Sequence, residues 1–367
     1  MKLEINKERL LRSIQKAEKI ASKNLTLPVL SCLLFETKNG LLKIKATNLD
    51  ISIIINNKAK IEKDGVAAIP SQTISSFISN LPKSDTNINL ELKDNNLLVN
   101  TKSSDTTIKT QSTEDFPEIK ETSSESQTRV KSEDFINGLN SVWYSSSNSN
   151  IKPELSSVYV YKDESNLFFV ATDSFRLAEK KINIKNIDNF EDVLIPFKNV
   201  TEIIRVFDGV DEDLSLDLIE DQLVLKSEEI YLSSRIVDGT FPDYKQIIPK
   251  ESKTNINVLK EDFIQSLKIS NIFSGKFNQV IFSILPEDKI FEIQSNSNDL
   301  GETKNVIKSK LSGDNLKISF NSKYINDCFG SIKSESISLD FSGLDKPMII
   351  KSSNDDSFTY LVMPMNK

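Results

Sequence analysis

The segment Val130-Lys131-Ser132-Glu133-Asp134-Phe135-Ile136-Asn137-Gly138-Leu139 recurs later in the chain as Val258-Leu259-Lys260-Glu261-Asp262-Phe263-Ile264-Gln265-Ser266-Leu267. A more divergent copy lies near the start, as Ile5-Asn6-Lys7-Glu8-Arg9-Leu10-Leu11-Arg12-Ser13-Ile14. Leu10, Phe135 and Phe263 occupy equivalent places, 125 and 128 residues apart. In each copy the apolar residues are spaced as on one face of an amphipathic helix. The pattern therefore predicts the same helix three times.

Two further features follow the same period. A short apolar segment followed by a helical pattern of about three turns occurs at residues 68–72, 194–198 and 318–322, and Ala46-Thr47-Asn48-Leu49 matches Ala171-Thr172-Asp173-Ser174, again 125 residues on. Alternating apolar and polar runs between these features are typical of strands. We expect an α+β fold built from three tandem copies, each with two helices packed on sheets. The composition turns polar near 120–126 and 250–254, which predicts domains at 1–125, 126–250 and 251–367.

Composition excludes several classes of protein. Of the 367 residues 38% are hydrophobic and 27% charged, as in soluble globular proteins, and no apolar stretch is long enough to span a membrane. The chain has no histidine and only Cys32 and Cys328, so neither a Cys/His zinc site nor a Ser-His-Asp triad can be assembled. We expect no cofactor, no metal and no catalytic activity. Two distant cysteines favour a reducing compartment, and hence a cytoplasmic location.

Four motifs resemble one known family over the whole chain, the bacterial sliding clamp, which is the beta subunit of DNA polymerase III. They are Leu25-Thr26-Leu27-Pro28-Val29-Leu30, Ala171-Thr172-Asp173-Ser174-Phe175-Arg176-Leu177-Ala178, Val237-Asp238-Gly239-Thr240-Phe241-Pro242-Asp243-Tyr244 and Tyr360-Leu361-Val362-Met363-Pro364-Met365. The resemblance implies a head-to-tail homodimer that closes into a ring around double-stranded DNA, with helices lining the hole. It implies a processivity subunit that binds the polymerase alpha subunit, the clamp loader and repair proteins through short peptides.

Lysines on the inner helices are the candidates for DNA contact. Arg12, Lys16, Lys19 and Lys23 are spaced by four, three and four residues, which places them on one helical face. Contacts to phosphates carry no base information, as sliding requires. An ordinary solvated charged face gives the same pattern. Further candidates on later helices are Lys198, Arg205, Lys323 and Lys333.

The resemblance also implies a partner-peptide pocket. The matching residues are Leu155, Thr172, Ser174, Phe175, Arg176, Leu177, Pro242, Ile247, Val362, Met363, Pro364 and Met365. Two alternatives stay open at this point, because a strand such as 360–363 is often core and Arg176 is equally suited to an internal ion pair. Relatives often have Gly followed by His or Tyr where this chain has Ser174-Phe175, so we expect an altered preference for partner motifs.

For the ring interface, the apolar positions that match the family are Ile108, Ile272 and Phe273, although ordinary strand residues would look the same. Closing a ring would remove the exposed edge strands that invite unwanted association. A repeat-built scaffold that binds only proteins is the main alternative function. An enzyme that uses Asp173 and Arg176 is a remote one. The net charge of -7 excludes a protein that grips DNA over its whole surface, but not one with lysines confined to inner helices.

Overall fold

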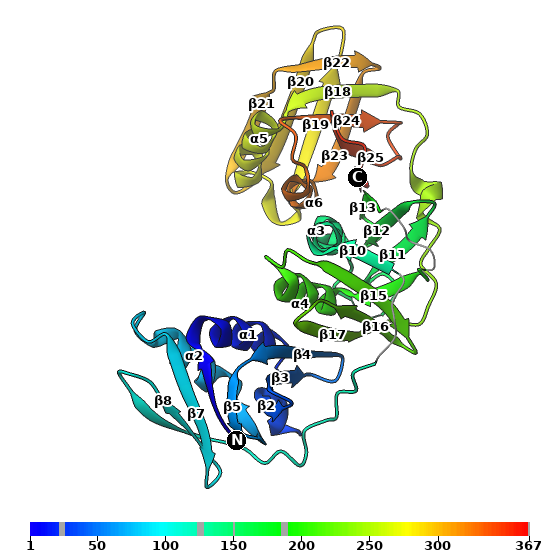
Figure 1. Ribbon diagram of the computed structural model, residues 1–367. Helices are drawn as coiled ribbons and strands as arrows, with labels where there is room; N and C mark the ends of the chain where they lie inside the picture. The colour runs from blue at the N-terminus through cyan, green and yellow to red at the C-terminus, as the bar shows by residue number, and fades with distance from the viewer. Residues whose placement is uncertain (22–25, 123–127, 150, 185–189, 366–367) are drawn as a thin grey trace. The chain divides into compact units, whose positions relative to one another are not determined.

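The computed structural model describes residues 1–21, 26–122, 128–149, 151–184 and 190–365. These residues form two compact units. The first consists mainly of Met1–Ile136 and Lys198–Ile236, and the second of Asn137–Lys185, Asp192–Phe197 and Val237–Lys367. The predicted α+β class and the three tandem copies are confirmed (Figure 1). The domain boundaries at 1–125, 126–250 and 251–367 stay a prediction, because the compact units divide the central copy between them.

Every copy contains two α-helices and a similar series of strands. Copy 1 contains β1 (Lys2–Asn6), α1 (Lys7–Ile20), β2 (Cys32–Lys38), β3 (Leu41–Thr47), β4 (Ile51–Lys58), β5 (Lys60–Lys63), β6 (Gly65–Pro70), α2 (Ser71–Asn80), β7 (Asn87–Lys93), β8 (Asn96–Asn100) and β9 (Asp105–Lys109). Copy 2 contains β10 (Thr128–Lys131), α3 (Ser132–Val142), β11 (Ser157–Asp163), β12 (Asn166–Thr172), β13 (Arg176–Asn183), β14 (Val193–Pro196), α4 (Phe197–Phe207), β15 (Asp213–Ile219), β16 (Gln222–Lys226) and β17 (Ile230–Arg235). Copy 3 contains β18 (Thr254–Leu259), α5 (Lys260–Ile272), β19 (Gln279–Leu285), β20 (Ile290–Ser297), β21 (Gly301–Val306), β22 (Ser309–Gly313), β23 (Leu316–Asn321), α6 (Ser322–Asp327), β24 (Ser336–Phe341), β25 (Met348–Ser352) and β26 (Phe358–Val362).

The strands of each copy form two half-sheets of four main strands. The half-sheet that begins the copy has the order β1-β7-β8-β9 in copy 1, β10-β15-β16-β17 in copy 2 and β18-β24-β25-β26 in copy 3. The other half-sheet has the order β6-β2-β3-β4, β14-β11-β12-β13 and β23-β19-β20-β21, respectively. The short strands β5 and β22 extend the half-sheets that begin copy 1 and copy 3, beside β1 and β18, respectively. The repeat seen in the sequence is therefore also a repeat of strand order.

Successive copies are joined by antiparallel pairing of one half-sheet with the next. Strand β17 of copy 2 pairs with β4 of copy 1, and the two half-sheets become one eight-stranded sheet inside the first unit. Strand β26 of copy 3 pairs with β13 of copy 2, and a nine-stranded sheet results inside the second unit. Within the described ranges, the half-sheets that end in β9 and β21 have no such neighbour, so both strands are edges.

The helices begin where the sequence predicts, and their lengths follow local packing. The side chain of Asn6 accepts a hydrogen bond from the N–H of Arg9 at 3.1 Å and caps α1, whose buried face includes Leu10 and Ile14. In α3, a Cβ at Gly138 would lie 2.4 Å from the ring of buried Phe169, so this helix needs glycine at the contact. The helical pattern after residue 322 is shorter than the predicted three turns. Helix α6 has six residues and continues as a 3-10 turn at Cys328–Ser331.

Candidate functional site

The turn between β12 and β13 presents Phe175 to solvent. The Asp173 carboxylate accepts hydrogen bonds from the backbone N–H groups of Phe175 and Arg176, each at 3.0 Å. The Thr172 hydroxyl donates to the Arg176 carbonyl at 2.7 Å, and Ser174 takes a left-handed conformation with φ of 75°. These contacts hold the Phe175 ring outward, with 60% of the residue exposed.

The C-terminal segment lies directly beside this turn. Beyond β26 the N–H of Met363 donates to the Phe175 carbonyl at 2.8 Å, and the N–H of Met365 donates to the Ser319 carbonyl at 2.8 Å. Met363, Pro364 and Met365 are half-buried along this path. Flexible methionine side chains beside an exposed aromatic ring form an adaptable apolar surface.

Arg176 is buried and its guanidinium points into the protein. It forms ion pairs with Asp173, at 3.1 Å, and with Asp327, and it donates to the Tyr144 carbonyl at 2.6 Å. The guanidinium also lies 4.7 Å from the centre of the Tyr324 ring, and that ring stacks with Phe175 at a centroid distance of 6.3 Å. Arg176 therefore forms an internal ion pair, as its sequence context also allowed.

The remaining predicted pocket residues divide into buried support and exposed rim. Leu155, Leu177 and Val362 are buried, and Leu177 packs in a cluster with Leu361, Phe241 and Tyr244. Pro242 and Ile247 are exposed on the segment that carries Phe241 and Tyr244. Val362 is fully buried, as the core alternative expects. The available apolar surface comes from Phe175, Pro242, Ile247 and the methionines.

Sequence reasoning missed Tyr324 and Asp327, which lie on α6 and complete the surroundings of Arg176. Asp327 is 151 positions from Arg176 in the chain. No local pattern in the sequence indicates such a contact, because it depends on pairing between copies. The one available hint was the need of a buried arginine for a carboxylate partner.

The charged row on α1 is only partly free. Arg12 and Lys19 are exposed, whereas Lys16 is half-buried and its ammonium donates to the Val206 carbonyl near the end of α4. Burial lowers the pKa of Lys16, against the opposing effect of Asp208. Lys23 lies outside the described residues.

A cleft of about 480 Å³ runs beside this row. Its basic wall is formed by Arg9, Arg12 and Lys16, and acidic residues line the other side, namely Asp208, Asp211, Glu212 and Glu229. Arg9 and Glu229 form an ion pair across it. The first half of the row therefore faces acidic groups of copy 2, so less of its positive charge is free than the helical spacing indicates.

The other candidates for DNA contact lie on exposed positions of α4, α6 and the turn that follows α6. Lys198 and Arg205 are exposed on α4, and Arg205 pairs with Glu202 at 2.7 Å. Lys323 is exposed in the first turn of α6, and Lys333 is exposed after the 3-10 turn. Lys333 is near enough to Lys180 to lower its pKa, after the larger effect of burial. Each copy therefore keeps exposed basic side chains among the predicted residues.

The predicted interface residues lie at the two open half-sheets. Ile108 is on the edge strand β9, but its side chain is buried against its own sheet, opposite Leu97. Ile272 ends α5 with 63% of the residue exposed, and Phe273 is half-buried beside it. Phe277 and Leu300, in the neighbouring turns, are exposed as well. Among the predicted interface positions, the exposed apolar side chains thus lie in copy 3, whereas β9 presents an open backbone edge.

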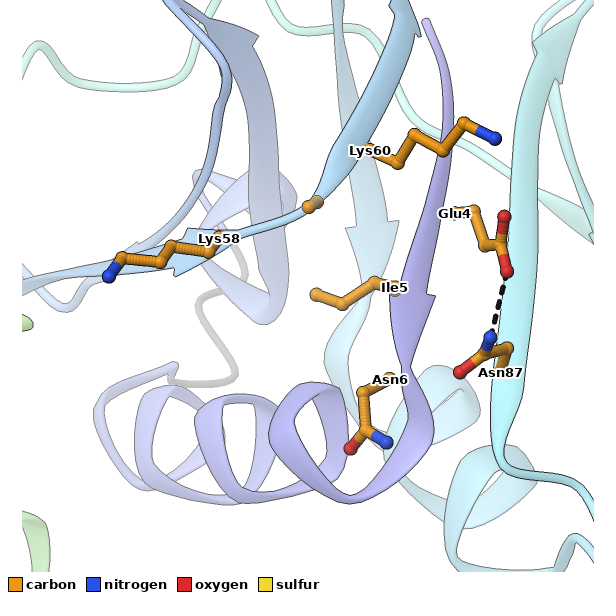
Figure 2. A pocket seen from close by; sticks show the side chains of 7 residues that line it. Glu4, Ile5, Asn6, Lys58, Lys60 and Asn87 are labelled. Atoms are coloured by element: carbon orange, nitrogen blue, oxygen red, sulfur yellow. Dashed lines mark hydrogen bonds between the residues drawn. The ribbon is translucent and has the colours of Figure 1, made fainter.

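A second hollow, of about 430 Å³, lies at the start of α1 (Figure 2). Glu4 accepts a hydrogen bond from Asn87 at 2.8 Å, and Lys58 extends away from that pair. Asn6 already caps α1. Among the residues that the structure describes, no group of three or more acidic, cysteine or histidine side chains could hold a metal ion. None of the described helices is long and apolar enough to cross a membrane.

Comparison with known proteins agrees with this architecture along the whole chain. Residues 1–120, 129–243 and 245–366 match the family models for the N-terminal, central and C-terminal domains of the DNA polymerase III beta subunit. The Beta sliding clamp of Bacillus subtilis is 26% identical over 378 residues, covering 100% of this chain and 99% of the relative.

Solved structures are similar over the same span. The DNA polymerase III beta subunit of Thermotoga maritima has 27% identity and a TM-score of 0.93, with 100% of this chain and 99% of that chain covered. A Pseudomonas aeruginosa clamp bound to griselimycin has 22% identity and a TM-score of 0.93, with both chains fully covered, and it supports the fold alone. The chain belongs to the DNA polymerase III beta subunit family.

Proposed function

We propose that two copies of this chain close head to tail into a ring around duplex DNA, and that the ring tethers the replicative polymerase for processive synthesis. The observation that carries the proposal is the pair of unmatched edges. At each junction within the chain, the last strand of a half-sheet that begins a copy pairs with the last strand of the other half-sheet of the preceding copy. These pairs are β17 with β4 and β26 with β13. Among the described strands, β9 and β21 hold the same two positions in their half-sheets, but neither has such a partner strand.

In a ring of two copies, both unpaired edge strands could pair through the same kind of junction that occurs twice within the chain. Each β9 would pair with the β21 of the other copy, and the sheets would continue without an edge. The exposed Ile272 supports this arrangement. By the repeat it is equivalent to Tyr144, which is partly buried beside the next copy and bonds to Ser331 at 3.0 Å. A second chain would cover Ile272 in the same way.

For DNA contact we propose Arg12, Lys19, Lys198, Arg205, Lys323 and Lys333, with Lys23 kept as an untested member of the row. Apart from Lys23, which lies outside the described residues, all of these basic side chains are exposed. Lys16 has a smaller part, because its ammonium is occupied by the Val206 carbonyl. Phosphate contacts of this kind are weak, screened by salt and independent of sequence, as a sliding ring requires.

For partners we propose a peptide-binding surface formed by Phe175, Pro242, Ile247 and Met363 to Met365, with the buried residues Leu155, Thr172, Leu177, Val362 and Arg176 and the turn residue Ser174 holding it in shape. Short peptides from the polymerase alpha subunit, the clamp loader and repair proteins are the expected occupants, and the cytoplasm is the expected location. Exposed apolar groups beside adaptable methionines support this assignment. Such a protein works by binding, without catalysis.

Sedimentation equilibrium tests the ring directly. At micromolar concentration we expect a species of twice 41.4 kDa. Changing Ile272 to Asp should shift the protein toward the monomer, because a charge would be placed in an apolar contact. Changing the equally exposed Leu344 to Asp is the matched control. A wild-type protein that stays monomeric would refute the ring.

A further inference from the structure

The threefold repeat defines which residues face each other at the junction between chains. At the first internal junction Leu232 pairs with Ile53, and at the second Tyr360 pairs with Ala178. The proposed junction between chains would be the third of its kind. If it keeps the same register, its residue pairs can be found by identifying the residues of β9 and β21 that are equivalent to Leu232 and Tyr360 and to Ile53 and Ala178. The inference rests on the proposed ring and specifies its contacts.

The equivalent residues in β9 are found by following the strand ladder from a fixed point in each copy. Ile5, Val130 and Val258 each stand two residues before a helix, and they pair with Ile88, Leu214 and Ile337, respectively. Two residues further along β7, in copy 1, Leu90 pairs with Val99, and Val99 pairs with Thr106 in β9. In copy 2, Leu216 pairs with Leu225, and Leu225 pairs with Leu232 in β17. In copy 3, Leu339 pairs with Ile350, and Ile350 pairs with Tyr360 in β26. Thr106 is therefore the counterpart of Leu232 and Tyr360.

The same procedure identifies the equivalent residues in β21. Ile69, Ile195 and Phe320 each stand two residues before a helix and pair with Leu33, Val158 and Val280, respectively. One residue further along β2, in copy 1, Leu34 pairs with Lys45, and Lys45 pairs with Ile54 in β4. In copy 2, Tyr159 pairs with Val170, and Val170 pairs with Glu179 in β13. In copy 3, Ile281 pairs with Gln294, and Gln294 pairs with Lys304 in β21. Lys304 is thus the counterpart of Ile54 and Glu179, and Thr303 that of Ile53 and Ala178.

We infer that Thr106 of one copy faces Thr303 of the other, so that Asp105 stands opposite Lys304 and Ile108 opposite Gly301. At the internal junctions the pairs that correspond to Asp105–Lys304 are Tyr231–Ile54 and Thr359–Glu179. Neither of those pairs is an ion pair. The junction between chains therefore places an opposite-charge pair at a strand position where neither junction within the chain has one, and this pair favours a second copy of the chain as the partner.

Burial supports this register. In β9 Asp105 and Thr107 are exposed, while Thr106 is partly and Ile108 fully buried. In β21 Glu302 and Lys304 are exposed, while Thr303 is partly buried. The inferred pairing places exposed Asp105 and Thr107 opposite exposed Lys304 and Glu302. A slip by one residue would set these exposed positions opposite the partly buried face.

Gly301 gives a second, independent fit. A Cβ placed there would lie 4.0 Å from the Phe273 ring, so this ring borders the space that a larger residue would occupy. Ile108 of the other copy would stand opposite Gly301 and adjoin Phe273. The apolar positions expected from the sequence thus meet across the junction, with the Asp105–Lys304 pair on the outer face.

Charge reversal tests the pair. Asp105→Lys places two lysines at both junctions of a ring, and Lys304→Asp places two aspartates there. Each variant alone should associate with itself more weakly by about tenfold, because attraction is replaced by repulsion twice. An equimolar mixture should recover the wild-type affinity. In a mixed ring the two reversed charges face each other at one junction, and the native pair of Asp105 and Lys304 remains at the other. Asp94→Lys, in the turn between β7 and β8, and Lys310→Asp, on the edge strand β22, are the charge-matched controls at exposed sites.

Cysteine cross-linking measures the register separately from the charge effect. Under oxidation Thr106→Cys with Thr303→Cys should give a covalently closed dimer, whereas Thr107→Cys with Thr303→Cys should not, because those side chains point to opposite faces. The native cysteines are both buried. Variants that associate like the wild type, a mixture that fails to recover, or cross-linking of the slipped pair alone would each overturn the register while a dimer persists. A wild-type monomer would overturn the ring as well.

Discussion

The backbone N–H of Met363 donates to the Phe175 carbonyl at 2.8 Å, which fixes the C-terminal segment beside the exposed turn. The first junction has the same bond at the equivalent place, from Arg235 to the Asp50 carbonyl, also at 2.8 Å. The turns are alike as well, since Asn48 accepts hydrogen bonds from the N–H groups of Asp50 and Ile51 as Asp173 does for Phe175 and Arg176. What differs is the side chains, charged at one junction and apolar at the other. One backbone design therefore gives an apolar surface at the second junction.

Removing residues 363–367 should abolish peptide binding and leave self-association unchanged. The truncation deletes the methionines and the two backbone bonds that hold the segment, whereas β9 and β21 are separate strands. A fluorescence titration with a labelled C-terminal peptide of the polymerase alpha subunit measures the first effect, and sedimentation the second. The exposed Leu344, changed to Ala, is the control. Undiminished peptide affinity would exclude this surface as the binding site.

Replacing Arg176 by Met should destabilise the protein by about 2–4 kcal/mol, because the carboxylates of Asp173 and Asp327 would remain largely buried without a cation. Arg205→Met is a matched control, since its pair with Glu202 is solvent-exposed on the arginine side and should contribute less than about 1 kcal/mol. The midpoint of denaturation by urea measures both. Equal midpoints for the two variants would show that the buried ion pairs do not stabilise the second unit.

Glu202 should make stability depend on pH. Its Oε2 atom is buried with no hydrogen-bond partner among the described residues, and burial raises the pKa of this carboxyl despite Arg205 and Lys19 nearby. A raised folded-state pKa means that the folded protein binds the proton more tightly, so stability falls as the pH rises through that pKa. Glu202→Gln should therefore raise stability at neutral pH by up to about 1 kcal/mol, with the gain disappearing toward the ordinary glutamate pKa of about 4.3. Denaturation curves at several pH values, with Glu335→Gln as an exposed control, test this, and a loss of stability at neutral pH would contradict it.

Lys198→Ala combined with Arg205→Ala should weaken binding to a short labelled duplex and reduce the salt dependence. Each lost phosphate contact lowers the slope of log K against log salt by about 0.9. Lys308→Ala with Lys310→Ala removes the same charge near the edge strand β22 and is the control. If both double variants show the wild-type slope, α4 does not face the DNA.

The fold class and the threefold repeat could be predicted from the sequence because helix faces and strand alternation are local patterns. The neighbours of Lys16 and Arg176 could not be predicted. Lys16 reaches Val206 and Arg176 reaches Asp327 across junctions between copies, and contacts over 190 and 151 positions leave no periodic signal. The resemblance predicts a set of pocket positions, but it does not distinguish buried Val362 from exposed Phe175. Exposure follows from where the turn and the C-terminal segment end, which only the structure gives.

The most direct test of the central claim is retention on circular DNA. Labelled protein is loaded with the clamp loader onto nicked circular DNA, free protein is removed at high salt, and the DNA is then cut at a single site. A closed ring should stay on the circle through the salt wash, because topology rather than affinity holds it, and should be released by sliding off after the cut. Protein that leaves the intact circle in high salt, or that stays on the cut DNA with free ends, would contradict the account.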